Sequence, residues 1–220
     1  MARNFKILTL KEKMQYIFDY YKLHIFVGII VVILTGNYIN ITFINPPPTP
    51  FLQIAIIDQA LEDDLLEQFL ATTKNHLIPE ELAEDYTIIV HNIPISMELI
   101  VIDTTEDGSE IAHLSEQDEA RLLRLNSLIN TRQLDVFISG HDIFNGFAEN
   151  GWFLPLNENI DTNHFAGRLL MLNGNIYGIR LDDSQVIKDL GYNVENAYIG
   201  IMANSQNIRN SLGFFNFIFE

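Results

Sequence analysis

Residues 51–58 read FLQIAIID, a continuous apolar run with the length of one β-strand. Residues 134–140, LDVFISG, form a second such run that is rich in branched and aromatic side chains. Strands whose apolar residues follow one another, without alternating polar residues, are typical of sheets that are covered on both faces. These two segments therefore predict an α/β domain.

Helical and strand-like patterns alternate around these two strands, as an α/β domain requires. Leucine-rich helical faces and capping residues predict helices at 61–77, 115–130, 141–151 and 205–219. Further apolar runs predict strands at 86–93, 97–104, 168–181 and 197–203. Ser115 is the expected N-cap of the second helix, and Gly151 the expected C-cap of the third.

A long uncharged segment precedes the domain, because residues 23–57 contain no Lys, Arg, Asp or Glu. Within it, HIFVGIIVVILTGNYINITFI (His24–Ile44) is long and apolar enough for a helix to cross the ~30 Å hydrocarbon layer. Residues 1–24 hold five basic and two acidic side chains, which favours a cytoplasmic N-terminus. We therefore expect an uncleaved anchor, with a cytoplasmic or interfacial amphipathic helix at 1–22 and a transmembrane helix at 23–44.

Two alternatives compete with a retained anchor. A cleaved signal peptide would use the apolar core Ile25–Leu34, but 22 residues precede this core and no Ala-x-Ala pattern follows it. The other alternative is a buried helix of a soluble protein. The chain contains no cysteine, which excludes lipid attachment through an N-terminal Cys and any disulfide.

The proline-rich segment NPPPTP at 45–50 predicts a stiff linker, and residues 51–220 are then the extracytoplasmic α/β domain. Residues 45–220 hold 8 basic and 27 acidic side chains, a net charge of −19. Phosphates would be repelled by this charge, so we expect no nucleic-acid partner. The same charge favours cationic ligands.

Polar residues that follow the predicted strands form the candidate ligand site. In open α/β sheets, ligands bind beyond the carboxyl ends of the strands, close to helix N-termini. The alternative is that Asp58, Asp142 and Ser205 cap the helices that follow them. The residues expected at this edge are Asp58, Gln59, Ser139, Gly140, His141, Asp142, Asn204 and Ser205.

No motif for catalysis or metal binding accompanies these residues. His141 and Asp142 are adjacent and lack further ligands at suitable spacing, and the acidic groups at 62–64 and 182–183 lack the spacing of a calcium loop. The sequence also lacks a Ser-His-Asp order, a P-loop and a dinucleotide fingerprint. We therefore expect no catalytic residue, no metal site and no cofactor, and we expect that the protein is not an enzyme.

Three segments resemble known proteins. LDVFISGHDIFNGFAENGWFLPLNE (134–158) is similar to a strand, short helix and FLPLNE-like segment of type 2 periplasmic-binding-like proteins. AYIGIMANSQN (197–207) resembles a later strand and helix start of the same class. YIFDYYKLHI (16–25), beside the apolar span, resembles uncharacterised single-pass membrane proteins of Gram-positive bacteria that carry such a domain. The resemblance implies a periplasmic-binding-like fold, reduced in size because two-lobed members are longer.

The resemblance implies two functional classes. In the first, the protein binds or senses a small solute or peptide near the membrane, and presents it to a membrane protein partner. In the second, the domain has lost its ligand cleft and is a non-catalytic interaction or scaffold module of an envelope or transporter complex. Both classes imply a single-pass protein of the cell membrane, with the N-terminus inside and the C-terminal domain outside.

Overall fold

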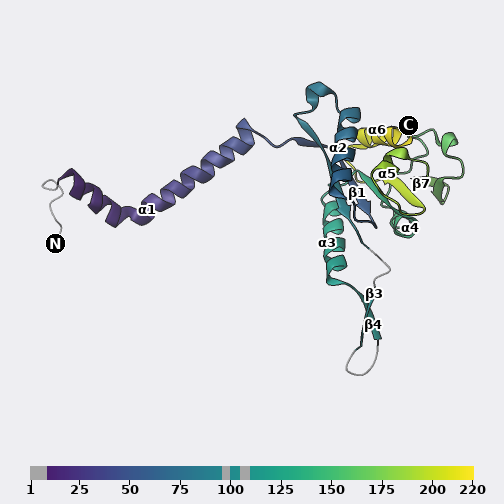
Figure 1. Cartoon of the computed structure of the whole chain (residues 1–220), viewed down its shortest axis with the longest axis horizontal. Helices are drawn as coiled ribbons and strands as arrows, with labels where there is room; N and C mark the ends of the chain where they lie inside the picture. Colours follow the sequence, from purple (N-terminus) through teal and green to yellow (C-terminus); the bar gives the residue numbers. More distant parts are fainter. Residues whose placement is uncertain (1–8, 96–99, 105–109) are drawn as a thin grey trace. The chain divides into compact units, whose positions relative to one another are not determined.

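The computed structural model describes residues 9–95, 100–104 and 110–220 (Figure 1). The chain divides into two compact units, Met1–Pro47 and Pro48–Glu220. β1 begins at Thr49, so the second unit takes up the last residues of the segment expected as a linker at 45–50.

The first unit is one long helix. α1 spans Leu10–Ile39 and continues as a π-helical turn over Asn40–Ile44. By length and composition, the segment Tyr20–Ile44 is apolar and long enough to cross a membrane, and none of it is buried within the chain. A signal sequence would meet the same criteria, so the retained anchor stays a prediction.

The second unit is built on a six-stranded mixed sheet in the order β2-β1-β5-β8-β7-β6. β1 is parallel to both β2 and β5, whereas β8 is antiparallel to β5, β7 to β8, and β6 to β7. The strands are β1 Thr49–Ile57, β2 Tyr86–Ile93, β5 Val136–Gly140, β6 Leu169–Leu172, β7 Asn175–Arg180 and β8 Ala197–Ile201. The predicted α/β class is confirmed.

Helices cover both faces of this sheet. On one face are α2 Asp63–Leu77, α5 Gln185–Asp189 and α6 Ile208–Phe219, and on the other are α3 Glu116–Asn130 and α4 His141–Glu149. Residues of β1 alternate between two cores: Leu52, Ile54 and Ile56 belong to the first, and Ala55 and Ile57 to the second. None of these five side chains is exposed, which confirms that the strand is buried on both faces.

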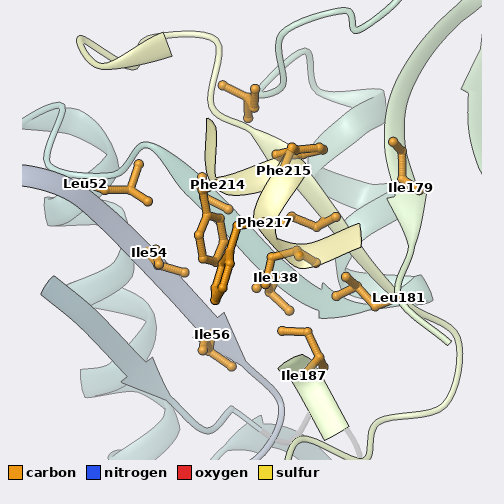
Figure 2. Packing of buried hydrophobic residues seen from close by; sticks show 14 of the residues in the cluster. Leu52, Ile54, Ile56, Ile138, Ile179, Leu181, Ile187, Phe214, Phe215 and Phe217 are labelled. Carbon is orange, nitrogen blue, oxygen red and sulfur yellow. The ribbon is translucent and has the colours of Figure 1, made fainter. Parts of the chain in front are cut away.

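Phenylalanines of α6 fill the centre of the first core. Figure 2 shows Phe214, Phe215 and Phe217 projecting from α6 among the aliphatic side chains of the sheet, in the same cluster as Ile54. The ring of Phe214 also meets that of Phe69 on α2 edge-to-face, with 6.2 Å between the ring centroids. This packing joins α2 and α6 over the sheet.

The second core is centred on Phe144 of α4. Its ring stacks on that of Phe153 with 4.3 Å between the centroids. The ring lies so close to β7 and β8 that a Cβ at Gly178 or Gly200 would come within 2.5 or 2.7 Å of it. Only glycine fits at these two strand positions.

The expected N-cap of α3 is confirmed, and the glycine expected to cap α4 lies one position after the C-cap residue, Asn150. The Ser115 hydroxyl accepts the N–H of Asp118 at 3.1 Å, which satisfies one free donor of the first turn of α3. At the end of α4, Gly151 has a φ of +74°, and Gly151 and Trp152 donate to the carbonyls of Ala148 and Phe147. This is the Schellman arrangement that ends many helices at a glycine.

The remaining elements are short. Two 3₁₀ helices lie at Glu80–Leu82 and Thr162–Phe165. The strand expected at 97–104 falls partly outside the described residues. Its described part, β3 (Ile100–Thr104), pairs with β4 (Glu110–Leu114) in a separate two-stranded sheet, and the sequence patterns did not indicate β4.

Candidate functional site

The direction of β8 separates the expected site residues into two groups. Because β8 is antiparallel to β5, Gly140 pairs with Ala197 at one edge of the sheet, and Val136 pairs with Ile201 at the other. Asn204 and Ser205, which follow β8, therefore lie at the opposite edge from Asp58 and Gly140. The expectation that all eight residues share one edge is wrong. We name the end of the sheet that contains Asp58 and Gly140 the Asp58 edge. The opposite end, where Asp135 precedes β5 and Ile201 ends β8, is the Asp135 edge.

Asp58 directly follows β1 and links it to α4. Its φ is 73°, a left-handed conformation that Asp and Asn adopt more readily than most residues. Its carboxylate accepts the N–H of Gly140, the N-cap residue of α4, at 2.6 Å. Asp58 does not cap α2, whose N-cap is Glu62, so the predicted local cap is wrong. The carboxylate instead meets the positive end of a helix from another part of the chain.

The surroundings of Asp58 disfavour its charged form. Burial raises the pKa of the Asp58 carboxyl, and the Gly140 hydrogen bond opposes this by lowering it. The neighbouring Asp142 carboxylate raises the pKa of Asp58 further. The net direction is upward, so the Asp58 edge holds a carboxylate that a cationic or hydrogen-bonding group would stabilise.

Gln59 fastens the loop after β1 to a second loop. Its side-chain Nε2 donates to the carbonyl of Gly191 at 2.8 Å, and its Oε1 accepts the N–H of Asn193 at 2.8 Å. Its backbone carbonyl accepts Nδ2 of Asn92, at the end of β2, at 2.8 Å. Both ends of the Gln59 amide are therefore occupied within the fold.

The residues at the start of α4 differ in accessibility. Ser139 is fully buried, and Gly140 has little space, since a Cβ there would lie 3.1 Å from Val194 and 3.3 Å from Asp58. The side chains of His141 and Asp142 are 52% and 102% exposed, with His141 Nδ1 3.0 Å from Asp142 Oδ1. Of this group, His141 and Asp142 are therefore the accessible polar side chains.

Tyr192 also belongs to the Asp58 edge, and the sequence patterns missed it. Its side chain is buried, and no residue in the described part of the chain hydrogen-bonds its hydroxyl. Burial raises the pKa of Tyr192, and the Asp58 carboxylate adds to the shift, so the hydroxyl stays protonated and able to donate. Tyr192 lines a pocket of about 250 Å³ together with Asp182, Lys188 and Val194.

The Asp135 edge is held by one buried carboxylate. Asp135 is 2% exposed and accepts the N–H of Gln53 on β1 at 2.9 Å. Its other oxygen accepts the Ser205 hydroxyl at 2.7 Å, and Asn207 Nδ2 lies 3.2 and 3.3 Å from the two oxygens. The carboxylate thus joins β1 and β5 to the loop before α6.

Ser205 and Asn204 have structural partners at this edge. The Ser205 hydroxyl accepts the N–H of Asn207 at 3.0 Å, and Asn207 is the N-cap of α6, so the predicted cap at Ser205 is displaced by two residues. Asn204 Nδ2 donates to the carbonyl of Ile129 at the end of α3 at 2.8 Å. These bonds account for Ser205 without a ligand, whereas Oδ1 of Asn204 is buried and has no hydrogen-bond partner among the described residues.

Within the described ranges, no group of three or more His, Asp or Glu side chains is arranged to hold a metal ion. At the Asp58 edge, His141 and Asp142 are paired with each other, but no third metal-ligating side chain among the described residues joins them. The chemistry available at this edge is therefore hydrogen bonding and ion pairing from Asp58, His141, Asp142 and Tyr192.

No protein-family model and no curated protein matches the chain. Solved structures are similar at low scores, among them the following three. An extracellular solute-binding protein family 1 from Alicyclobacillus acidocaldarius has a TM-score of 0.35 and 14% identity, over 61% of this chain and 28% of that one. The ABC substrate-binding protein Lmo0181 from Listeria monocytogenes, in complex with cycloalternan, has a TM-score of 0.34 and 13% identity. This match covers 60% of this chain and 28% of that one.

The bacterial solute receptor AcbH, described as having an exclusive preference for β-D-galactopyranose, gives a TM-score of 0.31 and 10% identity. The match covers 69% of this chain and 34% of AcbH. The chain thus spans about a third or less of the length of these proteins. At these scores the similarity carries no argument about function.

Proposed function

We propose that the protein is a membrane-anchored, solute-binding-like protein that binds a small ligand at the Asp58 edge. The observation that carries this proposal is the Tyr192 hydroxyl, which is buried in a residue that lines a pocket and has no hydrogen-bond partner among the described residues. A buried hydroxyl without a partner costs about 1–3 kcal/mol. Such a group needs a reason, and a ligand that accepts its hydrogen bond supplies one.

The groups at this edge select the ligand class. On the lining of the pocket, Tyr192 would donate a hydrogen bond, and Asp182 and Lys188 supply a carboxylate and an ammonium group. The Asp58 and Asp142 carboxylates lie outside the lining and add negative charge to this edge. The pocket, about 250 Å³, lies just below the usual ~300–1,000 Å³ of small-molecule sites. Together with the net charge of −19 on residues 45–220, this favours a small neutral or cationic solute with hydroxyl or amino groups.

A thermal-shift screen tests the site. The full-length protein in detergent would be heated with a panel of monosaccharides, polyols, amino acids and small amines. We expect at least one of them to raise Tm by mass action, and Tyr192→Phe to abolish that rise. Tyr86→Phe, a half-buried tyrosine at the Asp135 edge, is the matched control and should keep the rise. No response across the panel, or an equal response in Tyr192→Phe, would contradict the site.

The anchoring belongs to the same proposal. The span 23–44 would hold residues 51–220 outside the cell membrane, with residues 1–22 inside and 45–50 as the linker. Exposed apolar side chains along the helix, such as Ile29, Val32 and Phe43, support this placement. Such a large apolar surface is unfavourable in water and favourable in a lipid bilayer. Retention of the full chain in membranes washed with alkaline carbonate is expected, with residues 51–220 open to external protease. Release of the protein by the wash would contradict the anchor.

A second function, an interaction module without a ligand cleft, is favoured by a different observation. Asp58 is tied to Gly140, and the Gln59 amide is tied to Gly191 and Asn193, so much of this edge is held by internal hydrogen bonds. The module would require a protein partner instead. Photo-cross-linking from position 141, in place of the exposed His141, should then capture a specific membrane protein, while the solute panel gives no shift.

A further inference from the structure

A larger pocket lies between the segment that precedes β6 and the last turn of α6. Its volume is about 470 Å³, within the ~300–1,000 Å³ usual for small-molecule sites. It contains none of the residues of the Asp58 edge. Its lining includes Asp161, His164, Phe165, Arg168 and Phe219.

The guanidinium of Arg168 is held against two aromatic rings of this pocket. Its central carbon lies 5.3 Å from the ring centroid of Phe165 and 5.8 Å from that of Phe219. The two rings meet edge-to-face with 4.9 Å between their centroids. A cation over the face of an aromatic ring is attracted by the negative charge of that face. The rings therefore restrict where the guanidinium can lie.

The backbone at Arg168 is also fixed. Its N–H donates to the carbonyl of Phe165 at 2.9 Å, and its own carbonyl accepts the N–H of Arg180 at 2.8 Å. The Arg168 side chain is 23% exposed. Because the guanidinium is already positioned, a ligand that pairs with it loses less side-chain entropy on binding.

The present carboxylate partner of Arg168 can be replaced. Arg168 NH1 lies 3.2 Å from Oδ2 of Asp183, whose side chain is 75% exposed. Exposed ion pairs contribute little to stability because water screens them, so a better-placed carboxylate can displace Asp183. The planar guanidinium is suited to a carboxylate because it forms two parallel N–H···O bonds.

We propose that this pocket binds small aromatic carboxylates. The carboxylate would pair with Arg168, and the aromatic ring would pack against Phe165 and Phe219. Arg168 supplies the local positive charge that a carboxylate needs against the net charge of −19 on residues 45–220. The site is separate from the solute site at the Asp58 edge and does not depend on it.

Calorimetric titration of benzoate into the full-length protein in nanodiscs, with empty nanodiscs as the blank, tests this proposal. We expect benzoate to bind at least about tenfold more tightly than its neutral counterpart benzyl alcohol, a difference of about 1.4 kcal/mol. Equal binding of the two compounds, or no binding of benzoate at millimolar concentration, would overturn the proposal.

Variants of the ion pair make the test specific. Arg168→Gln should weaken benzoate binding about tenfold or more. Asp183→Asn should tighten it, because the competing carboxylate is gone. Asp182→Asn is the matched control. It makes the same change of charge at the neighbouring position, but the carboxylate that it removes pairs with Arg180 and not with Arg168. If Asp183→Asn and Asp182→Asn tighten binding equally, the effect is net charge and the Arg168 pairing is wrong.

Circular dichroism would confirm that the Arg168→Gln variant is folded. If it is not, Arg168→Lys keeps the charge and loses the planar fork, so it should bind benzoate more weakly than the native protein. Native-like binding by Arg168→Lys would contradict the role of the fork.

Discussion

The two edges of the sheet each carry an aspartate, and the two aspartates differ in how well they are satisfied. Asp135 is buried and accepts hydrogen bonds from Gln53, Ser205 and Asn207. Asp58 is half-buried and has a positive φ, and its charge acts on Tyr192, whose buried hydroxyl has no hydrogen-bond partner in the described part of the chain. A fully hydrogen-bonded buried carboxylate gives a unique, rigid structure. Backbone strain and incomplete hydrogen bonding are instead typical of functional sites.

The same substitution should therefore have opposite effects at the two edges, and the largest effect is expected at Asp135. Both oxygens of Asp135 accept hydrogen bonds, from Gln53, Ser205 and Asn207. In Asp135→Asn, one oxygen is replaced by an NH₂ group, which is itself a donor and therefore faces at least one of these donors without a hydrogen bond. We expect a loss of about 2–4 kcal/mol in the free energy of unfolding.

Urea titration followed by the fluorescence of Trp152, the only tryptophan, measures this loss in the second unit. The exposed Asp85 gives the control: Asp85→Asn should change the free energy by less than about 0.5 kcal/mol. A loss at Asp135 no larger than that at Asp85 would show that the hydrogen-bonded cluster contributes little.

A smaller loss is expected from Ser205→Ala. This change removes one donor to Asp135 and the acceptor for the Asn207 N–H, at a cost of about 1 kcal/mol. Ser127→Ala on the exposed face of α3 is the control and should cost nothing, since alanine favours helices. If Ser205→Ala instead weakened solute binding without loss of stability, the assignment of the two edges would be reversed.

Asp58→Asn should stabilise the protein slightly at neutral pH. Asn tolerates the positive φ and can still accept the Gly140 N–H, while the cost of burying a charge disappears. The gain should stay below about 1 kcal/mol, because water screens a half-buried group.

The gain should also depend on pH in a defined direction. The folded-state pKa of Asp58 is raised by burial, so native Asp58 lowers stability above that pKa and ceases to do so as the carboxyl takes up its proton. As the pH falls from above the raised pKa of Asp58 to the ordinary pKa of an aspartate, the difference in unfolding free energy between the variant and the native protein should therefore disappear. Urea midpoints at several pH values measure it, and a difference that grows on acidification would contradict the upward shift.

The sequence predicted those features that local pattern determines. The apolar run at 51–58 indicated a strand buried on both faces, and the run at 86–93 coincides with β2. The pairing direction of β8 is not local, since it depends on how the β6–β7 hairpin returns to the sheet, and this moved Asn204 and Ser205 to the other edge.

Long-range contacts also explain what was missed at the site. Tyr192 lies in a loop with no motif around it, and only folding brings it within electrostatic reach of Asp58, more than a hundred residues earlier in the chain. For Asp58, the alternative to a ligand contact was a cap of the following helix, but its carboxylate accepts the N–H of Gly140 instead. A single sequence carries no signal for either contact.

The stability of Tyr192→Phe, by urea titration of the ligand-free protein, tests the central claim most directly. The claim is that the Tyr192 hydroxyl is kept for a ligand and contributes nothing to the fold. The variant should therefore be as stable as the native protein, or more stable by up to about 1 kcal/mol, because an unsatisfied buried group is removed. A loss of about 1 kcal/mol or more would show that the hydroxyl is satisfied within the fold, and would contradict the claim.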